Sequence, residues 1–468
     1  MNRPGLLFSC RLIAALGLLT ALCAFSPADT VPSTAQSTTN IEEIEKAKTA
    51  LQKGQLDQAY QFLVDATKKD PDLPPARFML AKMLSQIRNT GQLARAHLEQ
   101  AAAENPDHPI IYVQNAEIDV QDGRYSDAVL NAEKALQLAR SDRWSATQKR
   151  LFSNDAHNTL AAVAEVRKHW PVAATHLRAL LESQPKDVKL RVRLAQALFY
   201  MDKPNEAYDE LKKAADVKDP TLQDTPEVLM AQLWTSKGDY PKAREWLNKA
   251  AKDGEKNVRV KLAYAEWLLQ QSDIPGAEVH VRAATALDPK NIDVMRLQGR
   301  IARYKKDLKS AVDIFQKIIA QAPTDFVARN HLALCLADSA DTETRKSAIP
   351  HAQLNVQANQ KSAEAWATLG YCLYKVKDVE EAMKALQVAT SGGQLSSDTG
   401  YYWALVLVEK GQNENAKNVL EGALDPKLKG LFHYRTEAQK LLDEVTKKIP
   451  PESKDKDKAK EKAKTNNR

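Results

Sequence analysis

Three arginines and one tyrosine in a short segment have the types and spacing to hold an acidic group: Arg296, Arg300, Arg303 and Tyr304. Their successive separations of four, three and one residues would place all four on one stripe of a helix. Guanidinium groups bind carboxylates through paired, charge-assisted hydrogen bonds, and a tyrosine ring adds flat apolar contact. Arginines on a helix are also an ordinary solvated face when acids such as Asp293 lie beside them. Two interpretations therefore stay open, a ligand contact or a plain surface.

Residue spacings typical of catalysis are absent from the sequence. It contains no His-Glu-x-x-His zinc motif, no glycine-rich phosphate loop and no nucleophile elbow. His169 and His176 are seven residues apart, but Pro171 separates them, and they are interpreted as unrelated surface residues. Acid pairs such as Glu380/Glu381 lie at expected helix starts, where a carboxylate stabilises the helix dipole. The sequence predicts a chain that is not an enzyme, with no catalytic, cofactor-binding or metal-ligating residues.

The elements that would position the arginine stripe recur along the chain. Small residues repeat at intervals of 34 to 37 residues, with one interval of 45, in a first ladder: Ala47, Ala81, Ala116, Ala161, Ala195, Ala231, Ala265, Gly299, Ala333, Gly370 and Ala404. A second ladder runs in step with it: Ala59, Ala96, Ala128, Ala173, Ala207, Ala243, Ala277, Ala311, Ala348, Ala382 and Ala416. Glycines such as Gly54 and Gly238 lie between the ladders, so each unit is expected to be two helices that touch at small residues. Self-similarity at this period indicates a stacked array.

The clearest copies of the repeat carry a known pattern. One copy reads Trp366, Leu369, Gly370, Leu373, Val379, Ala382, Leu386 and Ala389, and another reads Gly238, Tyr240, Ala243, Leu247 and Ala250. In order and spacing these residues resemble the tetratricopeptide repeat family, and the resemblance covers about residues 40–424. It implies an all-α fold, a right-handed α-solenoid of about eleven helix-turn-helix units. Departures are extra residues near 89–91, an insertion at 141–152, and Pro350 inside an expected second helix, which should start late or kink.

The resemblance also assigns a surface. In the family the first helices line a concave face, with side chains one, four and five positions after the first-ladder residue and three before it. This register places the arginine stripe on that face and adds Asn330, Tyr371, Tyr374 and Tyr401, giving eight predicted partner-binding residues. Such a face is expected to bind proteins, including acidic or extended peptide segments. The Lys/Asn/Asn/Lys/Arg clamp by which some family members hold chaperone tails is not found, which disfavours that partner class.

The N-terminal 28 residues have the pattern of a secretory signal peptide. Arg3 and Arg11 precede an apolar run, and small residues end it at 26–28. The run of about 14 residues is shorter than the ~20 that span a membrane, which favours cleavage over a retained membrane anchor. Lipidation at Cys23 is a further alternative, although Leu22 is bulky where that motif takes a small residue. Residues 29–39 are rich in serine and threonine and are expected to form a flexible linker.

The C-terminal end divides into two parts. Residues 427–447 are predicted to form a capping helix, since Phe432, Tyr434, Ala438, Leu441, Leu442 and Val445 place apolar side chains along one face. Terminal caps of this kind cover the last exposed surface of a repeat array. Residues 448–468 are almost wholly charged or small, so they are expected to be a disordered tail.

Net charge and cysteine content exclude further classes. The chain carries a net charge of +7, of which the signal supplies +2 and the tail +3, so residues 29–450 are close to neutral at +2. A near-neutral body argues against nucleic-acid binding, which depends on dense phosphate neutralisation. Cys335 and Cys372 occupy equivalent positions of neighbouring repeats, ~8–10 Å apart in stacked helices, too far for a disulfide. They are predicted to be buried free thiols.

These observations together predict a non-enzymatic interaction scaffold that is exported to the periplasm or the exterior of a bacterial cell. Assembly of the cell envelope or of a secretion machine is the expected setting, by analogy of fold alone. The alternative is a glycan- or polymer-binding module in polysaccharide export. Peripheral association with a membrane also stays open.

Overall fold

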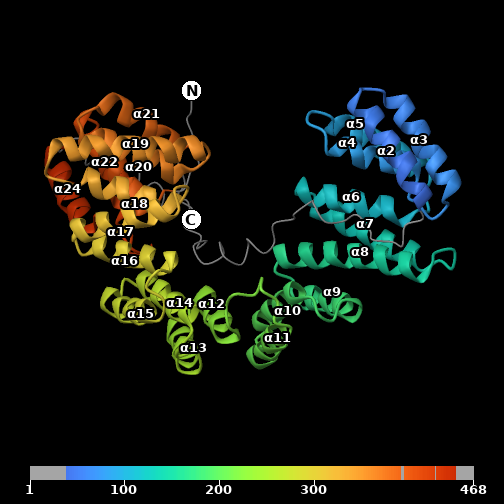
Figure 1. Cartoon of the computed structure of the whole chain (residues 1–468), viewed down its shortest axis with the longest axis horizontal. Helices are drawn as coiled ribbons and strands as arrows, with labels where there is room; N and C mark the ends of the chain where they lie inside the picture. Colours follow the sequence, from blue (N-terminus) through green and yellow to red (C-terminus); the bar gives the residue numbers. More distant parts are fainter. Residues whose placement is uncertain (1–37, 392–394, 427, 429, 450–468) are drawn as a thin grey trace, which may run out of the picture. The chain divides into compact units, whose positions relative to one another are not determined.

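The computed structural model describes residues 38–391, 395–426, 428 and 430–449, and every regular element in that part of the chain is an α-helix (Figure 1). Eleven first helices alternate with eleven second helices. The first helices are α2 (Thr38–Gln52), α4 (Ala76–Ser85), α6 (Pro109–Gln121), α8 (Ala146–Val166), α10 (Val188–Tyr200), α12 (Pro226–Lys237), α14 (Val258–Gln270), α16 (Ile292–Tyr304), α18 (Phe326–Ala337), α20 (Ala363–Lys375) and α22 (Ser397–Glu409). The second helices are α3 (Leu56–Lys69), α5 (Gly91–Glu104), α7 (Tyr125–Ala139), α9 (Trp170–Ser183), α11 (Pro204–Asp216), α13 (Tyr240–Asp253), α15 (Ile274–Leu287), α17 (Leu308–Gln321), α19 (Thr342–Ala358), α21 (Val379–Thr390) and α23 (Asn413–Ala423). The last helix, α24 (Arg435–Lys448), follows the eleventh pair. The predicted all-α array of eleven helix-turn-helix units with a capping helix is confirmed.

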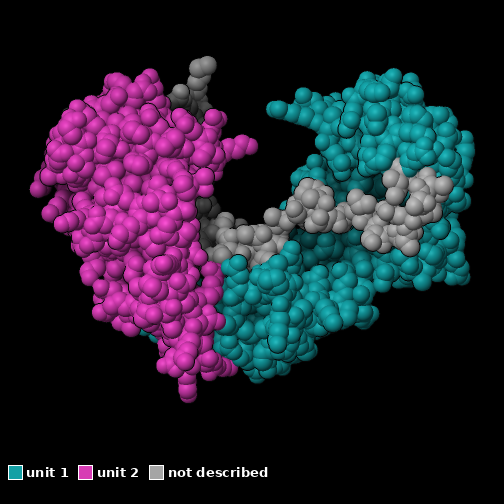
Figure 2. All heavy atoms as spheres, in the orientation of Figure 1, with its two compact units in different colours: residues 1–246 teal, residues 247–468 magenta. Residues whose placement is uncertain are grey.

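The chain divides into two compact units, and the boundary lies within α13. Unit 1 comprises residues 1–246 and unit 2 comprises residues 247–468 (Figure 2). Unit 2 contains the arginine stripe on α16, all the other predicted binding residues, and α24.

The small residues of the first ladder are where paired helices come closest. Gly299 shows the reason, because a Cβ atom built there would lie 2.6 Å from Cζ of Phe315. At Gly370 a Cβ atom would lie 2.5 Å from Cγ of Leu386 and 3.1 Å from the carbonyl oxygen of Ala382. Both contacts are shorter than side chains tolerate, so these two positions require glycine while the other repeats accommodate alanine.

The second ladder holds in every repeat but one. Its alanines are fully buried, with the exception of Ala96, which is exposed. Ala94 is the buried residue of α5, so the ladder position was assigned two residues too late in the second repeat. The inter-helix turn there contains one additional residue, near Asn89, and this shifts the register.

A left-handed residue separates the two helices in ten of the eleven pairs of the described chain. Glycine provides it at four turns, and Asn89, Lys168, Asp202, Ser272, Lys306 and Lys377 adopt the same positive φ without glycine. The ninth pair is the one without such a residue. Its second helix, α19, begins at Thr342 and continues through Pro350. The expectation of a late start for this helix is therefore wrong: it starts six residues before Ala348.

The predicted insertion at 141–152 extends a helix rather than forming a long loop. Ser145 caps α8 in a reciprocal arrangement with Gln148, and α8 is 21 residues long. Trp144 covers the added turns, with its ring centroid 5.4 Å from that of Phe152 and its Nε1 donating to Leu138 O at 3.0 Å. The added length is thus packed onto the neighbouring repeat.

The ends of the array differ in how much the structure describes. The predicted signal peptide (1–28), with Cys23, lies outside the described residues, as does the linker (29–39) up to Thr38, where α2 begins. The tail (448–468) lies outside them after Ile449. The capping helix begins at Arg435, eight residues later than the predicted range 427–447. None of the described helices has the length and apolar character needed to cross a bilayer.

Candidate partner-binding site

The arginine stripe lies on α16 of unit 2. Asn291 caps this helix by accepting hydrogen bonds from the backbone nitrogens of Asp293 (3.0 Å) and Val294 (3.3 Å). Val294, Leu297 and Ile301 bury one face of the helix. The arginines therefore project from the remaining faces, as their spacing predicts.

Arg296 is bound within the chain. Its Nε donates to Oδ2 of Asp325 at 2.9 Å, and its other nitrogens reach Asp325 and Asp293. Asp325 is buried and also caps α18, accepting from the backbone nitrogen of Ala328 at 2.8 Å. The hydrogen bond to Asp325 raises the pKa of Arg296. This arginine thus ties α16 to the start of α18.

Arg300 is half-buried, and two acids influence its charge. Burial lowers its pKa, and the negative charges of Glu266 and Glu364 partly offset that effect. Glu364 is itself held by Asn330, whose Nδ2 donates to it at 2.9 Å, and burial raises the pKa of Glu364. Among the described residues, Arg300 has no hydrogen-bond or ion-pair partner of its own. Of the eight predicted residues it is therefore the best placed to contact a partner.

Residues 430–434, which we call the C-terminal segment, lie across the first helices of unit 2. The carbonyl oxygen of Gly430 accepts from Ser272, directly after α14 (3.5 Å), and that of Phe432 accepts from Tyr304 of α16 (3.4 Å). The backbone nitrogen of His433 donates to Asp398 of α22 at 3.0 Å. These contacts span 35 to 158 residues of sequence, so the chain returns to helices it formed much earlier.

Tyr434 is the most deeply engaged residue of the C-terminal segment. Its hydroxyl accepts from Arg303 Nη2 at 3.0 Å and donates to Asp338 Oδ2 at 2.6 Å. Its ring stacks on Tyr401, with centroids 5.1 Å apart and planes at 21°, and contacts Tyr371 and Tyr402 at centroid distances of 5.5 Å. We call the surrounding residues the tyrosine site: Arg303, Asp338, Tyr371, Tyr401 and Tyr402.

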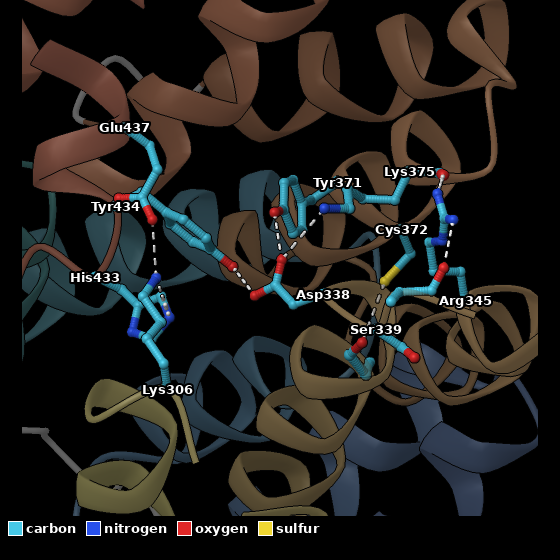
Figure 3. Close-up of polar contacts among 12 residues, drawn as sticks. Lys306, Asp338, Ser339, Arg345, Tyr371, Cys372, Lys375, His433, Tyr434 and Glu437 are labelled. Carbon is cyan, nitrogen blue, oxygen red and sulfur yellow. Dashed lines mark hydrogen bonds and ion pairs between the residues drawn. The ribbon is translucent and has the colours of Figure 1, made fainter. Parts of the chain in front are cut away.

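Asp338 is the polar centre of the tyrosine site. The hydroxyls of Tyr371 and Tyr434 both donate to it at 2.6 Å, and Lys375 Nζ lies 3.5 Å from it (Figure 3). Burial, and then the negative charge of Asp338, raise the pKa of Tyr371 well above its ordinary value, so this phenol stays protonated. The aspartate is consequently neutralised by two hydroxyl donors and one lysine.

The flanks of Tyr434 are fixed by further polar contacts. Lys306 Nζ lies 3.1 Å from Glu437 on α24 and 3.4 Å from Nε2 of His433 (Figure 3). Burial, then the charges of Arg303 and Lys306, lower the pKa of His433 to about 2, so the imidazole is neutral at physiological pH. Burial raises the pKa of Asp398 to about 6.

The structure separates the eight predicted residues into two groups. Four contact the C-terminal segment: Arg303, Tyr304, Tyr371 and Tyr401. The other four lie elsewhere on the first helices, where Arg296 is paired with Asp325, Asn330 is buried against Glu364, Tyr374 is half-buried beside Lys377, and Arg300 faces its two acids. Partner binding by any of the eight stays a prediction.

Sequence reasoning missed several residues of this site. Asp338 lies five positions after Ala333, so the same register that selected Tyr304 assigns it to the concave face. Tyr402 and Asp398 follow from no such position. Phe432 and Tyr434 were assigned to the capping helix, although their spacing of two residues is typical of extended chain rather than of a helix.

Unit 1 offers a different surface. A cavity of about 410 Å³ lies between α5, α6 and α7, but its buried acid, Asp119, already pairs with Arg124 (2.5 Å) and Asn131 (2.7 Å). Tyr200, in the fifth repeat, stacks on Trp170 at a centroid distance of 4.6 Å. The described residues contain no group of three or more His, Cys, Asp or Glu able to hold a metal ion. Cys335 and Cys372 are buried free thiols, and burial raises the pKa of both.

Comparison with known proteins agrees with the repeat assignment. The tetratricopeptide repeat family model matches residues 260–326, which include α16 and the whole arginine stripe. A BBSome complex member BBS4 homolog from Drosophila melanogaster is 24% identical over 305 residues, covering 64% of this chain and 60% of the relative. The chain thus spans less than two thirds of that relative's length.

Solved structures with a similar course are repeat arrays of low identity. The APC/C hetero-tetramer Cut9-Hcn1 matches with a TM-score of 0.41 and 14% identity over 87% of this chain and 96% of that chain. Yeast Tom70 matches with a TM-score of 0.36 and 15% identity over 88% and 96% of the two chains. Likenesses at such TM-scores carry no argument about function.

Proposed function

Because this chain carries tetratricopeptide repeats, we propose that it is a non-enzymatic scaffold that binds partner proteins on the first-helix surfaces of its repeats. One observation supports this most directly: the C-terminal segment already lies across α14, α16 and α22 and is held by side chains that contact its backbone and its tyrosine. A surface that orders a short segment of its own chain has the donors and acceptors needed to order another. Acidic or extended peptide segments are the proposed ligands.

The cellular setting is a further part of the proposal. We place the protein in the periplasm or outside the cell, in assembly of the envelope or of a secretion machine, and the support is the signal-like pattern of residues 1–28. Fractionation of cells expressing the full chain tests this placement. Recovery in the cytoplasm with the first 28 residues intact would contradict it, and radiolabelled palmitate retained by wild type but lost in Cys23→Ser would show a lipid anchor.

The glycan-binding alternative receives no support from the site. Stacking on sugars needs accessible aromatic faces, but Tyr371 and Tyr401 are covered by Tyr434 and by Tyr402. The function proposed is therefore the binding of a protein partner.

Site-specific photocrosslinking tests the scaffold. A photoreactive amino acid at Arg300 is expected to capture a protein partner, because this side chain faces the first-helix surface without a partner of its own among the described residues. Lys317, which is exposed on the second helix α17, is the matched control position. Arg300→Gln should weaken capture from a second position on the same face, Lys375, with little change in melting temperature. Equal capture at Arg300 and Lys317 would contradict the assignment of the surface.

A further inference from the structure

We propose that the tyrosine site is a recognition site for a short segment of a partner protein that presents a tyrosine, and that residues 430–434 occupy it in cis until such a partner competes. This rests on the proposed function, and it names the partner's chemistry and the regulation of the same surface. The C-terminal segment is thus both the cap of unit 2 and an internal copy of the ligand.

The polar groups of the site are arranged for a hydroxyl and not merely for a ring. A purely structural cap would bury apolar side chains, because buried charges cost free energy unless they are paired. Here Arg303 is 5% exposed, and the hydroxyl of Tyr434 receives its Nη2 hydrogen bond. The same hydroxyl donates to Asp338. Phenylalanine at this position would leave Arg303 without its hydrogen-bond partner and Asp338 with one donor fewer, so the site discriminates in favour of tyrosine.

The apolar walls of the site fit one aromatic ring. Tyr401 stacks nearly parallel to Tyr434, and Tyr402 meets it edge-on at 71°. Tyr371 completes the enclosure, and all three rings are buried. Aromatic pairs in such offset and edge-to-face arrangements contribute beyond the area they bury.

The surroundings of the ring also hold the backbone of the segment. Tyr304 donates to the carbonyl of Phe432, and Asp398 accepts from the backbone nitrogen of His433. Neither contact depends on which side chain the ligand carries at those positions. A partner therefore needs a tyrosine within a turn like that of residues 432–435, where the backbone nitrogen of Arg435 donates to the carbonyl oxygen of Phe432 at 3.4 Å. It also needs an apolar residue two positions before the tyrosine to replace Phe432, which is 3% exposed.

Attachment to the same chain determines how a partner gains access. A tethered ligand competes at a high effective concentration, in the millimolar range for short flexible connections. Contacts of α24 add to this, because Ala438 and Val445 are fully buried. A free segment is thus expected to bind the intact chain weakly and to bind strongly once Tyr434 is removed from the site.

A labelled peptide tests the proposal on the full-length chain. The probe is a fluorescent peptide of residues 430–440, and its anisotropy is titrated against wild type, Tyr434→Ala and the unit 1 control Tyr112→Ala. Tyr434→Ala should bind the probe at least about ten-fold more tightly than wild type and Tyr112→Ala do. A probe with phenylalanine at the position of Tyr434 should bind Tyr434→Ala about ten-fold or more weakly than the parent probe. Equal affinity of the two probes, or no binding to a folded Tyr434→Ala, overturns the proposal.

A second variant keeps the test decisive should Tyr434→Ala fail to fold. A protease site inserted after Asp425 leaves every residue of the tyrosine site unchanged, and cleavage converts the cis ligand into a separable fragment. The probe should then replace the fragment, whereas failure to exchange at any probe excess overturns the proposal. Light scattering distinguishes the occupant: dimers in which two copies exchange their C-terminal segments would make a second copy the ligand and overturn the partner proposed here.

The outcomes also separate this proposal from the scaffold function. If a photoreactive residue at Arg300 captures a partner but the probe does not bind, the scaffold function is supported and the tyrosine site is not part of it. Probe binding without capture at Arg300 supports the tyrosine site and contradicts the wider surface. Loss of both results would remove both proposals.

Discussion

The first-helix surfaces of the two units differ in how their charged side chains are paired. In unit 2 the C-terminal segment contacts Arg303 of α16 and Asp338 directly after α18, and these opposite charges meet at the hydroxyl of Tyr434. In unit 1 the packed helices α6 and α8 carry the acids Glu117 and Asp155. Burial, and then the negative charge of Glu117, raise the pKa of Asp155. The positive charge of Lys82 lowers the pKa of Asp155, but this offsets the increase only in part.

The difference shows what decides the role of such a face. Both units have first-helix surfaces, but the sign and pairing of the charges on them determine whether another segment can cover them. Opposite charges with a shared hydroxyl permit burial in unit 2, whereas like charges in unit 1 oppose it. Substitutions in the C-terminal segment should therefore destabilise unit 2, and the stability of unit 1 should depend on pH.

The largest effect is expected from Tyr434→Ala. The change removes a fully enclosed aromatic ring and the hydrogen-bond partner of Arg303, which should lower the free energy of unfolding of unit 2 by about 4 kcal/mol. Urea denaturation with hydrogen exchange resolved by segment measures it. Tyr112→Ala, at a half-buried tyrosine of unit 1, should cost much less and should leave exchange in α16 to α22 unchanged. Equal loss of hydrogen-exchange protection in both units would show that Tyr434 does not stabilise unit 2 specifically.

Gly370→Ala should destabilise unit 2 by about 2 kcal/mol, through overpacking rather than through a lost contact. The added Cβ would lie 2.5 Å from Cγ of Leu386 and 3.1 Å from a backbone oxygen that cannot move freely. Gly91→Ala is the matched change in unit 1, where nothing lies within 4 Å of the new atom, and it should be neutral or slightly stabilising. Thermal unfolding of both variants measures the contrast, and a neutral Gly370→Ala would contradict the close approach of α20 and α21.

Asp155→Asn should stabilise unit 1 in a pH-dependent manner. The pKa of Asp155 is raised from 3.8 to about 7, so between about pH 4 and pH 7 the folded chain keeps a proton that the unfolded chain has lost. Stability therefore falls as the pH rises through this window, and the variant should exceed wild type by up to about 4 kcal/mol at pH 7.5 and by almost nothing at pH 4. Asp398→Asn in unit 2 should show the same direction over a narrower window, since its pKa is raised only to about 6. Parallel pH profiles for wild type and Asp155→Asn would contradict the raised pKa of Asp155.

The repeats could be predicted from the sequence because their signal is local and repeated. A ladder residue such as Gly299 is small for a steric reason that recurs every 34 residues or so, and errors in one repeat are corrected by its neighbours. The exception shows the limit of this signal. Ala94 and Ala96 are both small residues of α5, and one additional turn residue was enough to shift the choice from the buried alanine to the exposed one.

The tyrosine site could be predicted only in part. Register alone located Arg303, Tyr371 and Tyr401, because each lies at a fixed distance from a ladder residue. The residue that joins them, Tyr434, lies 131 positions after Arg303, and no local pattern records a contact of that range. The start of α24 was missed for a related reason: a helix was extended through Phe432 and Tyr434, although their spacing is that of extended chain.

The smallest expected effect sharpens the comparison at the two lysines that directly follow α16. Lys306 pairs with Glu437 on α24 at 3.1 Å, and Lys305 pairs with Glu278 on α15 at 3.2 Å. Both pairs are exposed, so Lys306→Gln and Lys305→Gln should each cost less than about 1 kcal/mol, and the cost should vanish in 1 M salt, where screening acts within ~3 Å. Only Lys306→Gln should speed hydrogen exchange in α24 and raise the affinity for the labelled peptide of residues 430–440, by about two- to five-fold. If Lys305→Gln had the same effect, the change would reflect the helix as a whole, and the C-terminal segment would not be released through this contact.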